Sequence, residues 1–322
     1  MSGNTGSEEA LSKCQQWLKD CDENHERCRQ YLNSPLPSRV LDLGDAKANL
    51  CKDVKLHESA PSERASYTTL SYCWGGEKFI TTTASTLSER KANIDWSELP
   101  AVFQDIVTFC RRIGVRYLWI DALCILQDSK DDWRKEASRM KDYYSNAYIS
   151  LSAAKASRPS EGCYTGHLPW GYKSHTLRSP PKAKFPYAIH VRRTRYFERP
   201  PIHERAWCFQ EHELPSRVLM FRGMELQWYC YEHAICECGN HEGAREETED
   251  RLPREDFTTV QSHGDARLEW YRSIDEYTDR NLTVQSDILP ALSGLAGKMA
   301  ERHPGARYLA GLWEDTLISD LM

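Results

Sequence analysis

The chain has 322 residues, 40% of them hydrophobic and 11% aromatic, which is enough to bury a large core in one elaborated domain or two closely packed lobes. Its 42 basic and 47 acidic residues give a net charge of -5 without a long Lys/Arg run, which argues against nucleic acid as the main ligand. No apolar run reaches the roughly 18 residues of a membrane span, and the polar start does not resemble a signal peptide, so we expect a cytoplasmic protein with reduced cysteines.

Residues 1–34 are predicted to form an N-terminal helical segment, because apolar residues and cysteines recur there with helical spacing. Cys14, Cys21, His25 and Cys28 could in principle surround a zinc ion. The six residues between the first two cysteines lack the short spacing of a zinc knuckle, so the sequence favours small core residues on one helix face. No metal site is predicted.

The next elements alternate between strands and helices. Residues 39–43 and 54–56 are predicted to form a short antiparallel strand pair. A helix is predicted from Leu99 to Ile113, where apolar side chains recur with helical spacing and Gly114 ends the helix. With a strand before it and a strand after it, this helix completes the strand–helix–strand unit of a parallel sheet.

The strand before that helix, residues 67–76, is rich in β-forming residues and ends in a glycine pair that begins at Gly75. Glycine lets the backbone turn sharply and approach a ligand closely. Ser71, Tyr72 and Trp74 would then lie at the carboxyl end of the strand. An aromatic strand followed by an ordinary turn is the alternative interpretation.

The segment 117–128 is almost entirely apolar apart from Asp121, and it is predicted to be a strand buried on both faces. A buried carboxylate without partners is costly, so Asp121 should either accept hydrogen bonds from backbone donors or face a cleft. Ligands of open α/β sheets bind beyond the carboxyl ends of the strands, which makes this end of the segment the first candidate for a site.

A second helix is predicted at residues 131–147, followed by a strand at residues 148–154. Glu136 could be functional, but its position early in an amphipathic helix favours a solvated charge that complements the helix dipole. The region 155–203 has proline-rich and basic patches with short alternating runs, and it is predicted to be an inserted β-hairpin region.

A helix is predicted again at residues 204–214. Trp207 and Glu211 are four residues apart and share a helix face, so an aromatic ring and a carboxylate could line one pocket. Cys208 could be a nucleophile, but no histidine at a fixed spacing supports this, and we predict a core role.

Residues 226–322 are predicted to be a mainly helical C-terminal extension packed on the core, with helices around residues 270–277 and 288–296. The charged residues 242–256 are predicted to be a solvated loop. Potential metal ligands are densest near the start of the extension, but their spacing fits no familiar zinc pattern. These residues are Cys230, His233, Cys236, Cys238 and His241.

Three blocks in this order resemble the fungal heterokaryon-incompatibility domain. They are Tyr67–Gly75 (YTTLSYCWG), Tyr117–Asp128 (YLWIDALCILQD) followed by Trp133 and Glu136, and Arg205–Glu211 (RAWCFQE). The resemblance assigns residues 35–225 to this domain, with the insertion at about residues 155–203. That family is implicated in nonself recognition and programmed cell death when genetically different fungal cells fuse.

This family is in turn distantly similar to Toll/interleukin-1 receptor (TIR) domains. The resemblance implies an α/β fold, with a TIR-like central and mostly parallel sheet flanked by helices, a β-rich insertion, and extra helices at both ends. The run Trp207–Glu211 resembles the segment that carries the catalytic glutamate of the NAD-cleaving members.

The implied activity is hydrolysis of NAD, or a related nucleotide, at the nicotinamide–ribose bond, with NAD as substrate and no cofactor. Glu211 would be the catalytic residue and would stabilise an oxocarbenium-like transition state. The residues that would bind the nucleotide are Ser71, Tyr72, Trp74, Gly75, Asp121, Arg205 and Trp207.

Related domains assemble head to tail, so we expect self-association, and an allelic or NLR-type partner protein is a further expectation. The first alternative is a non-enzymatic, self-assembling death-signalling adaptor. The second is a metal-dependent hydrolase that uses the cysteine and histidine clusters.

Overall fold

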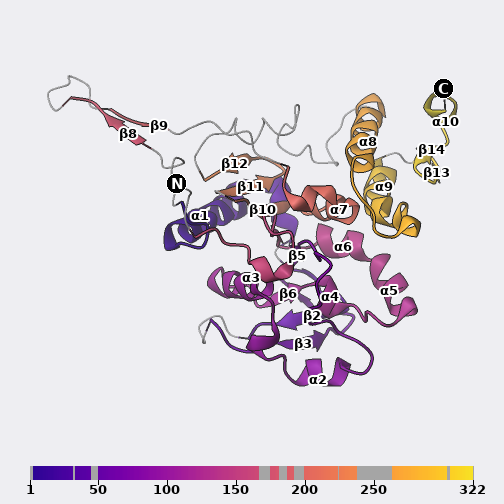
Figure 1. Ribbon diagram of the computed structural model, residues 1–322. Coiled ribbons are helices and arrows are strands. Elements are labelled where there is room, and N and C mark those ends of the chain that lie inside the picture. Colours follow the sequence, from indigo (N-terminus) through magenta and orange to yellow (C-terminus); the bar gives the residue numbers. More distant parts are fainter. Residues whose placement is uncertain are drawn as a thin grey trace.

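Within the described residues, eight strands form one mixed sheet with helices on both sides, which confirms the predicted α/β class (Figure 1). The computed structural model describes residues 3–31, 33–44, 50–166, 175–180, 187–191, 199–223, 225–237, 263–302 and 305–321. Across the sheet the strand order is β12-β11-β10-β7-β5-β6-β2-β3.

Parallel strands occupy the centre of this sheet. They are β10 (Arg217–Phe221), β7 (Ile149–Ser152), β5 (Tyr67–Ser71) and β6 (Tyr117–Trp119). Every residue of β5, β7 and β10 is buried, as expected for strands that are covered on both faces.

The order of the parallel strands reverses at β5. β6 follows β5 in the chain and pairs with one side of it, whereas β7 comes later and pairs with the other side. In open α/β sheets, ligands bind at such a switch point, beyond the carboxyl ends of the two diverging strands. Ser71 of β5 and Ser152 of β7 are register partners at this edge.

Antiparallel strands extend the sheet on both sides. β2 (Arg39–Asp42) pairs with β6 and with β3 (Lys55–Glu58), which confirms the predicted antiparallel pair. On the other side, β11 (Leu226–Cys230) and β12 (Ala234–Cys236) continue the sheet from β10.

Short strand pairs lie outside this sheet. They are β1 (Ser34–Pro35) with β4 (Arg64–Ala65), β8 (His175–Arg178) with β9 (Ala188–Val191), and β13 (Tyr308–Leu309) with β14 (Leu312–Trp313). The β8–β9 pair is antiparallel and lies within the region predicted to be an inserted hairpin.

Helices connect and cover these strands. They are α1 (Glu8–Asn24), α2 (Leu87–Ala92), α3 (Ala101–Arg112), α4 (Asp121–Cys124), α5 (Lys130–Ala137), α6 (Met140–Ser145), α7 (Ala206–Glu213), α8 (His263–Thr278), α9 (Pro290–Arg302) and α10 (Leu317–Asp320). Short 3₁₀ helices are η1 (Glu26–Tyr31), η2 (Trp96–Glu98), η3 (Pro159–Glu161), η4 (Pro201–Glu204) and η5 (Gln285–Asp287).

The helices cover the two faces of the sheet. In Figure 1, α1 and α3 lie on one side of the strands, and α6, α7 and α9 lie on the other. On the first side, the ring of Phe109 in α3 meets Phe221 of β10 at 5.3 Å between centroids. On the second side, Tyr144 of α6 meets Trp119 of β6 at 5.6 Å.

The prediction of one buried strand over residues 117–128 is wrong beyond Trp119. β6 ends there, and α4 begins at Asp121. The carboxylate of Asp121 accepts a hydrogen bond from the backbone N–H of Ala122 at 2.7 Å. A short run of apolar residues does not distinguish a buried strand from a buried helical turn, and this polar side chain at the start of the turn favours the helix.

The predicted helix over residues 131–147 is two helices, α5 and α6, and Glu136 is buried instead of solvated. Its carboxylate accepts hydrogen bonds from the hydroxyls of Ser38 at 2.5 Å and Tyr143 at 2.7 Å. The break between the helices lets Tyr143 of α6 reach back to Glu136 of α5. This buried acid therefore holds α5, α6 and the segment before β2 together.

The C-terminal helices predicted around residues 270–277 and 288–296 correspond to α8 and α9. Residues 242–256, Cys238 and His241 lie outside the described residues. Cysteines of the described part have free thiols, as expected, except Cys236, which is disulfide-bonded.

Candidate functional site

A small cavity lies at the switch point of the sheet. It has room for about one water molecule, and its wall joins the paired Ser71 and Ser152 to the helix α7. The lining residues are Ser71, Ser152, Ile202, His203, Cys208, Glu211, His212 and Val218. The strand order thus places a cavity where open α/β sheets bind ligands.

Glu211 is the carboxylate of this cavity. It is only 7% exposed, and it accepts a hydrogen bond from the hydroxyl of Ser71. Burial raises the pKa of Glu211 to about 7, and the neighbouring carboxylate of Asp121 adds to this rise. Interactions with Ser71, Arg205 and Cys208 lower the pKa of Glu211 and so oppose this rise. Glu211 therefore changes its charge near neutral pH.

Asp121 is the second carboxylate of this region, and its hydrogen bonds tie the loop after β5 to α4. The hydroxyl of Tyr72 and the indole N–H of Trp74 each donate to it at 2.9 Å. Burial raises the pKa of Asp121, although these two hydrogen bonds oppose the rise. Tyr72 and Trp74 are thus oriented by Asp121.

Arg205 supplies positive charge next to the two carboxylates. Its guanidinium donates to the backbone carbonyl of Tyr72 at 2.6 Å. Burial alone would lower the pKa of Arg205, but Cys208, Glu211 and Asp121 outweigh burial and raise it. Among the described residues, no ion pair joins Arg205 to Glu211, so its influence on the carboxylate acts through space.

Trp207 and Gly75 lie away from the cavity wall. The indole N–H of Trp207 donates to Asp287 at 3.1 Å, and its ring packs edge-on against Trp133 at 6.3 Å. Gly75 has a φ of +65°, and a Cβ at this position would lie 2.3 Å from the Cβ of Arg158. Trp207 and Glu211 share α7, but the structure brings only Glu211 to the cavity.

Sequence reasoning missed Ser152, His203 and His212 as wall residues. Ser152 could have been found from its place at the end of the strand that pairs with β5. His203 and His212 carry no sequence pattern that marks them, and only the fold brings them together, with ring centroids 6.0 Å apart.

Cys208 lines the cavity, but its chemistry agrees with the predicted core role. It is buried, and burial raises the pKa of its thiol well above the usual value, with the nearby Glu211 adding to the rise. A thiol that stays protonated is a poor nucleophile.

Potential metal ligands gather elsewhere, where the end of α1 meets the end of β11. Cys21, His25, Cys28 and Cys230 are all buried there, and their ligand atoms lie within 4.8 Å of one another.

Among the described helices, none combines the length and apolar character needed to cross a bilayer.

Comparison with known families identifies the central part of the chain. Residues 67–211 match the model of the heterokaryon incompatibility protein (HET) family. No curated protein and no solved structure matches the chain. The matched segment begins with β5, contains the three sequence blocks described above, and ends at Glu211. Residues 67–211 of this chain are therefore similar to the heterokaryon incompatibility (HET) domain.

Proposed function

We propose that this HET domain is a cell-death effector of fungal nonself recognition that cleaves NAD at the nicotinamide–ribose bond, with Glu211 as the catalytic residue. The observation that carries the proposal is a buried carboxylate that lines a cavity at the switch point of the sheet and titrates near neutral pH. Perturbed acids in such positions are typical of catalytic sites, although buried acids also serve structural roles.

The chemistry of NAD suits a single carboxylate. The bond from C1′ of the ribose to nicotinamide breaks, and its electron pair moves to the pyridinium nitrogen, so nicotinamide leaves as a neutral molecule. Water then adds to C1′ and releases a proton, which gives ADP-ribose. Ionised Glu211 would stabilise the positive charge that develops at C1′, and no acid is needed for the leaving group.

The positive charge of the nicotinamide ring and the ionised form of Glu211 would stabilise each other. A pyridinium ring placed next to Glu211 favours the ionised carboxylate and lowers its pKa. Ser71 would orient the carboxylate, since its hydroxyl already donates to Glu211. Asp121 would hold Tyr72 and Trp74 in place at the same strand end.

The size of the cavity sets a condition for this activity. The cavity has room for about one water molecule, far less than the roughly 300–1,000 Å³ of typical small-molecule sites. We therefore propose that the nicotinamide riboside end of NAD enters only after the wall opens, and that self-association is the event that opens or completes the site. Trp207 and Gly75 would take part only after such a rearrangement.

The alternative function is a non-enzymatic adaptor that signals by self-assembly. The observation that favours it is the tight burial of Glu211, which is compatible with a purely structural acid. In that case, the HET domain would act through its assembled surfaces, and NAD would remain intact.

The test is to incubate purified protein with NAD, with and without a fused oligomerising partner, and to measure nicotinamide release. We expect release by the assembled wild type and a loss of at least about 100-fold in Glu211→Gln. Glu213→Gln is the matched control, since Glu213 is a buried acid of the same helix that does not line the cavity. An assembled form that kills cells with its NAD untouched, and with Glu211→Gln equally lethal, would exclude the enzymatic function.

A further inference from the structure

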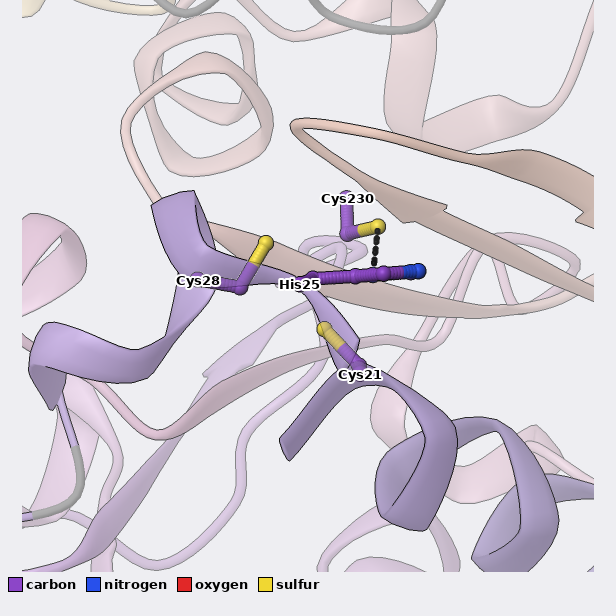
Figure 2. A group of neighbouring side chains, drawn as sticks. All are labelled: Cys21, His25, Cys28 and Cys230. Carbon is purple, nitrogen blue, oxygen red and sulfur yellow. Dashed lines mark hydrogen bonds between the residues drawn. The ribbon is translucent and has the colours of Figure 1, made fainter. Parts of the chain in front are cut away.

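Three cysteines and one histidine from distant parts of the chain converge at the end of α1. Cys21 lies in the last turn of α1, His25 caps this helix, Cys28 lies in η1, and Cys230 is the last residue of β11. Figure 2 shows the three thiols and the imidazole turned toward one another. The sequence favoured core cysteines here, because the six residues between Cys14 and Cys21 lack the short spacing of a zinc knuckle. Cys230 is about 200 residues away from the other three ligands.

We propose that Cys21, His25, Cys28 and Cys230 bind one structural zinc ion. All four side chains are buried, and their ligand atoms lie within 4.8 Å of one another. The Nδ1 atom of His25 is 3.4 Å from the sulfur of Cys230. In a tetrahedral zinc site, neighbouring ligand atoms are about 3.5–3.8 Å apart, so small side-chain shifts complete the coordination.

The donor set identifies the kind of metal. Three thiolates and one imidazole form a Cys₃His site, which suits zinc and does not suit the oxygen-preferring magnesium or calcium. Four protein ligands leave no open position for a water, so the site is structural and not hydrolytic. The spacing within 4.8 Å fits a single ion.

Backbone N–H groups around the site point at the sulfurs. The N–H of His233 donates to the sulfur of Cys230 at 3.2 Å. Backbone hydrogen bonds from Tyr231 to Cys28 and from Glu232 to Cys230 accompany it. Such N–H to sulfur contacts stabilise thiolate ligands and fix their direction.

Charged groups around the site also match a metal-bound thiolate cluster. Arg217 is fully buried, and its Nε–H donates to the sulfur of Cys21 at 3.1 Å. A zinc ion with three thiolates and a neutral imidazole carries one negative charge, which this buried guanidinium, shared with Asp22 in an ion pair of 2.7 Å, partly offsets. On the far side of the imidazole, Nε2 of His25 faces Asp20 at 3.8 Å, the arrangement in which a carboxylate orients a histidine ligand.

A second grouping shares one of these ligands. Asp20, His25 and His233 also lie within 4.8 Å of one another, but Asp20 and His233 are exposed. We assign the ion to the four buried residues, because they complete a tetrahedral shell without solvent. His25 can use its Nδ1 atom for the metal and keep Nε2 for Asp20.

The site would fasten the N-terminal helix to the sheet. α1 already packs on β11, where Trp17 meets Trp228 at 6.3 Å. All four ligands lie outside residues 67–211, so the ion would support the flank of the HET domain and not its cavity. The inference is therefore independent of the proposed function.

The test uses the full chain without an affinity tag, expressed in zinc-supplemented medium and passed through metal-free buffer. Elemental analysis should find about one zinc per chain. Cys230→Ser and Cys28→Ser should retain less than about 0.2 zinc per chain, whereas Cys14→Ala should retain the wild-type content. Cys14 is the matched control, because it is a fully buried thiol of α1 that lies outside the cluster.

Wild-type protein decides the question even if the cysteine variants do not fold. Replacing zinc by Co²⁺ should produce thiolate charge-transfer bands and the visible absorption of a tetrahedral ion. Wild type that holds no zinc, or that has these cysteines in a disulfide, would overturn the proposal. So would zinc that is lost in His233→Ala but kept in Cys230→Ser.

Discussion

Replacing Glu211 by glutamine should make the protein less sensitive to pH. Burial raises the pKa of Glu211 from its ordinary value of 4.5 to about 7 in the folded protein. Between these two values, the folded protein binds more protons than the unfolded chain. The stability contribution of this carboxyl group is therefore fully present below pH 4.5 and is lost as the pH rises through about 7.

The size of the effect follows from this shift. A shift of one pKa unit corresponds to about 1.4 kcal/mol, so ionising Glu211 in the folded protein costs about 3 kcal/mol above neutral pH. Glutamine is neutral at every pH and still offers an oxygen to the hydroxyl of Ser71. The unfolding free energy of Glu211→Gln, minus that of the wild type, should rise by about 2–3 kcal/mol from about pH 5 to about pH 8.

The assay is urea unfolding of both proteins across this pH range, followed by tryptophan fluorescence. All other titrating groups are common to the two proteins, so their contributions cancel in the difference to first order. A difference that stays constant within about 0.5 kcal/mol over the whole range would refute the assignment of Glu211 as a buried acid with a raised pKa.

Other consequences can be checked separately. The kcat/KM of NAD cleavage should increase with pH through about 7, because the ionised form of Glu211 in the free enzyme is the active one; a kcat/KM that falls over this range would contradict that role. Asp121→Asn removes a negative charge that raises the pKa of Glu211, so the midpoint of this pH profile should move to lower pH. Gly75→Ala should destabilise the protein by at least about 2 kcal/mol, because its Cβ would collide with Arg158 in addition to the strain of positive φ. Gly76→Ala is the control, because Gly76 has a φ of +72° and no atom lies within 4 Å of the new Cβ, so this variant should lose only about 1 kcal/mol of unfolding free energy. Both variants are measured by thermal or urea unfolding. Equal losses at the two positions would show that the collision with Arg158 is absent.

The local pattern of the sequence was sufficient for most helices and strands. The spacing of apolar residues in α3 and the glycine after it determine that helix, and Gly114 closes it with a φ of +79°. The apolar residues of the strand after it predict that strand but not its end, because the apolar run continues into α4 with Asp121 as its one polar interruption there. Glu136 was misjudged for a related reason, since a helix position alone does not reveal what packs over it.

The chain order of strands and helices, together with the resemblance to HET domains, is sufficient to indicate Glu211 and the end of β5 as the site. Which of the proposed residues share a wall depended on the tertiary structure. Trp207 and Glu211 are on one short helix, yet Trp207 packs on Trp133 while Glu211 meets Ser71. Local spacing specifies a helix face, but the neighbours of that face are set by the order of strands in the sheet.

The same distinction explains the cysteine–histidine cluster. The sequence alone determined that Cys21, His25 and Cys28 lie close together, since they occupy adjacent turns. Only the pairing of β11 with β10, and the packing of α1 on β11, brought Cys230 to them. Contacts between residues about 200 positions apart depend on the whole fold, because no local periodicity encodes which distant element will cover a helix.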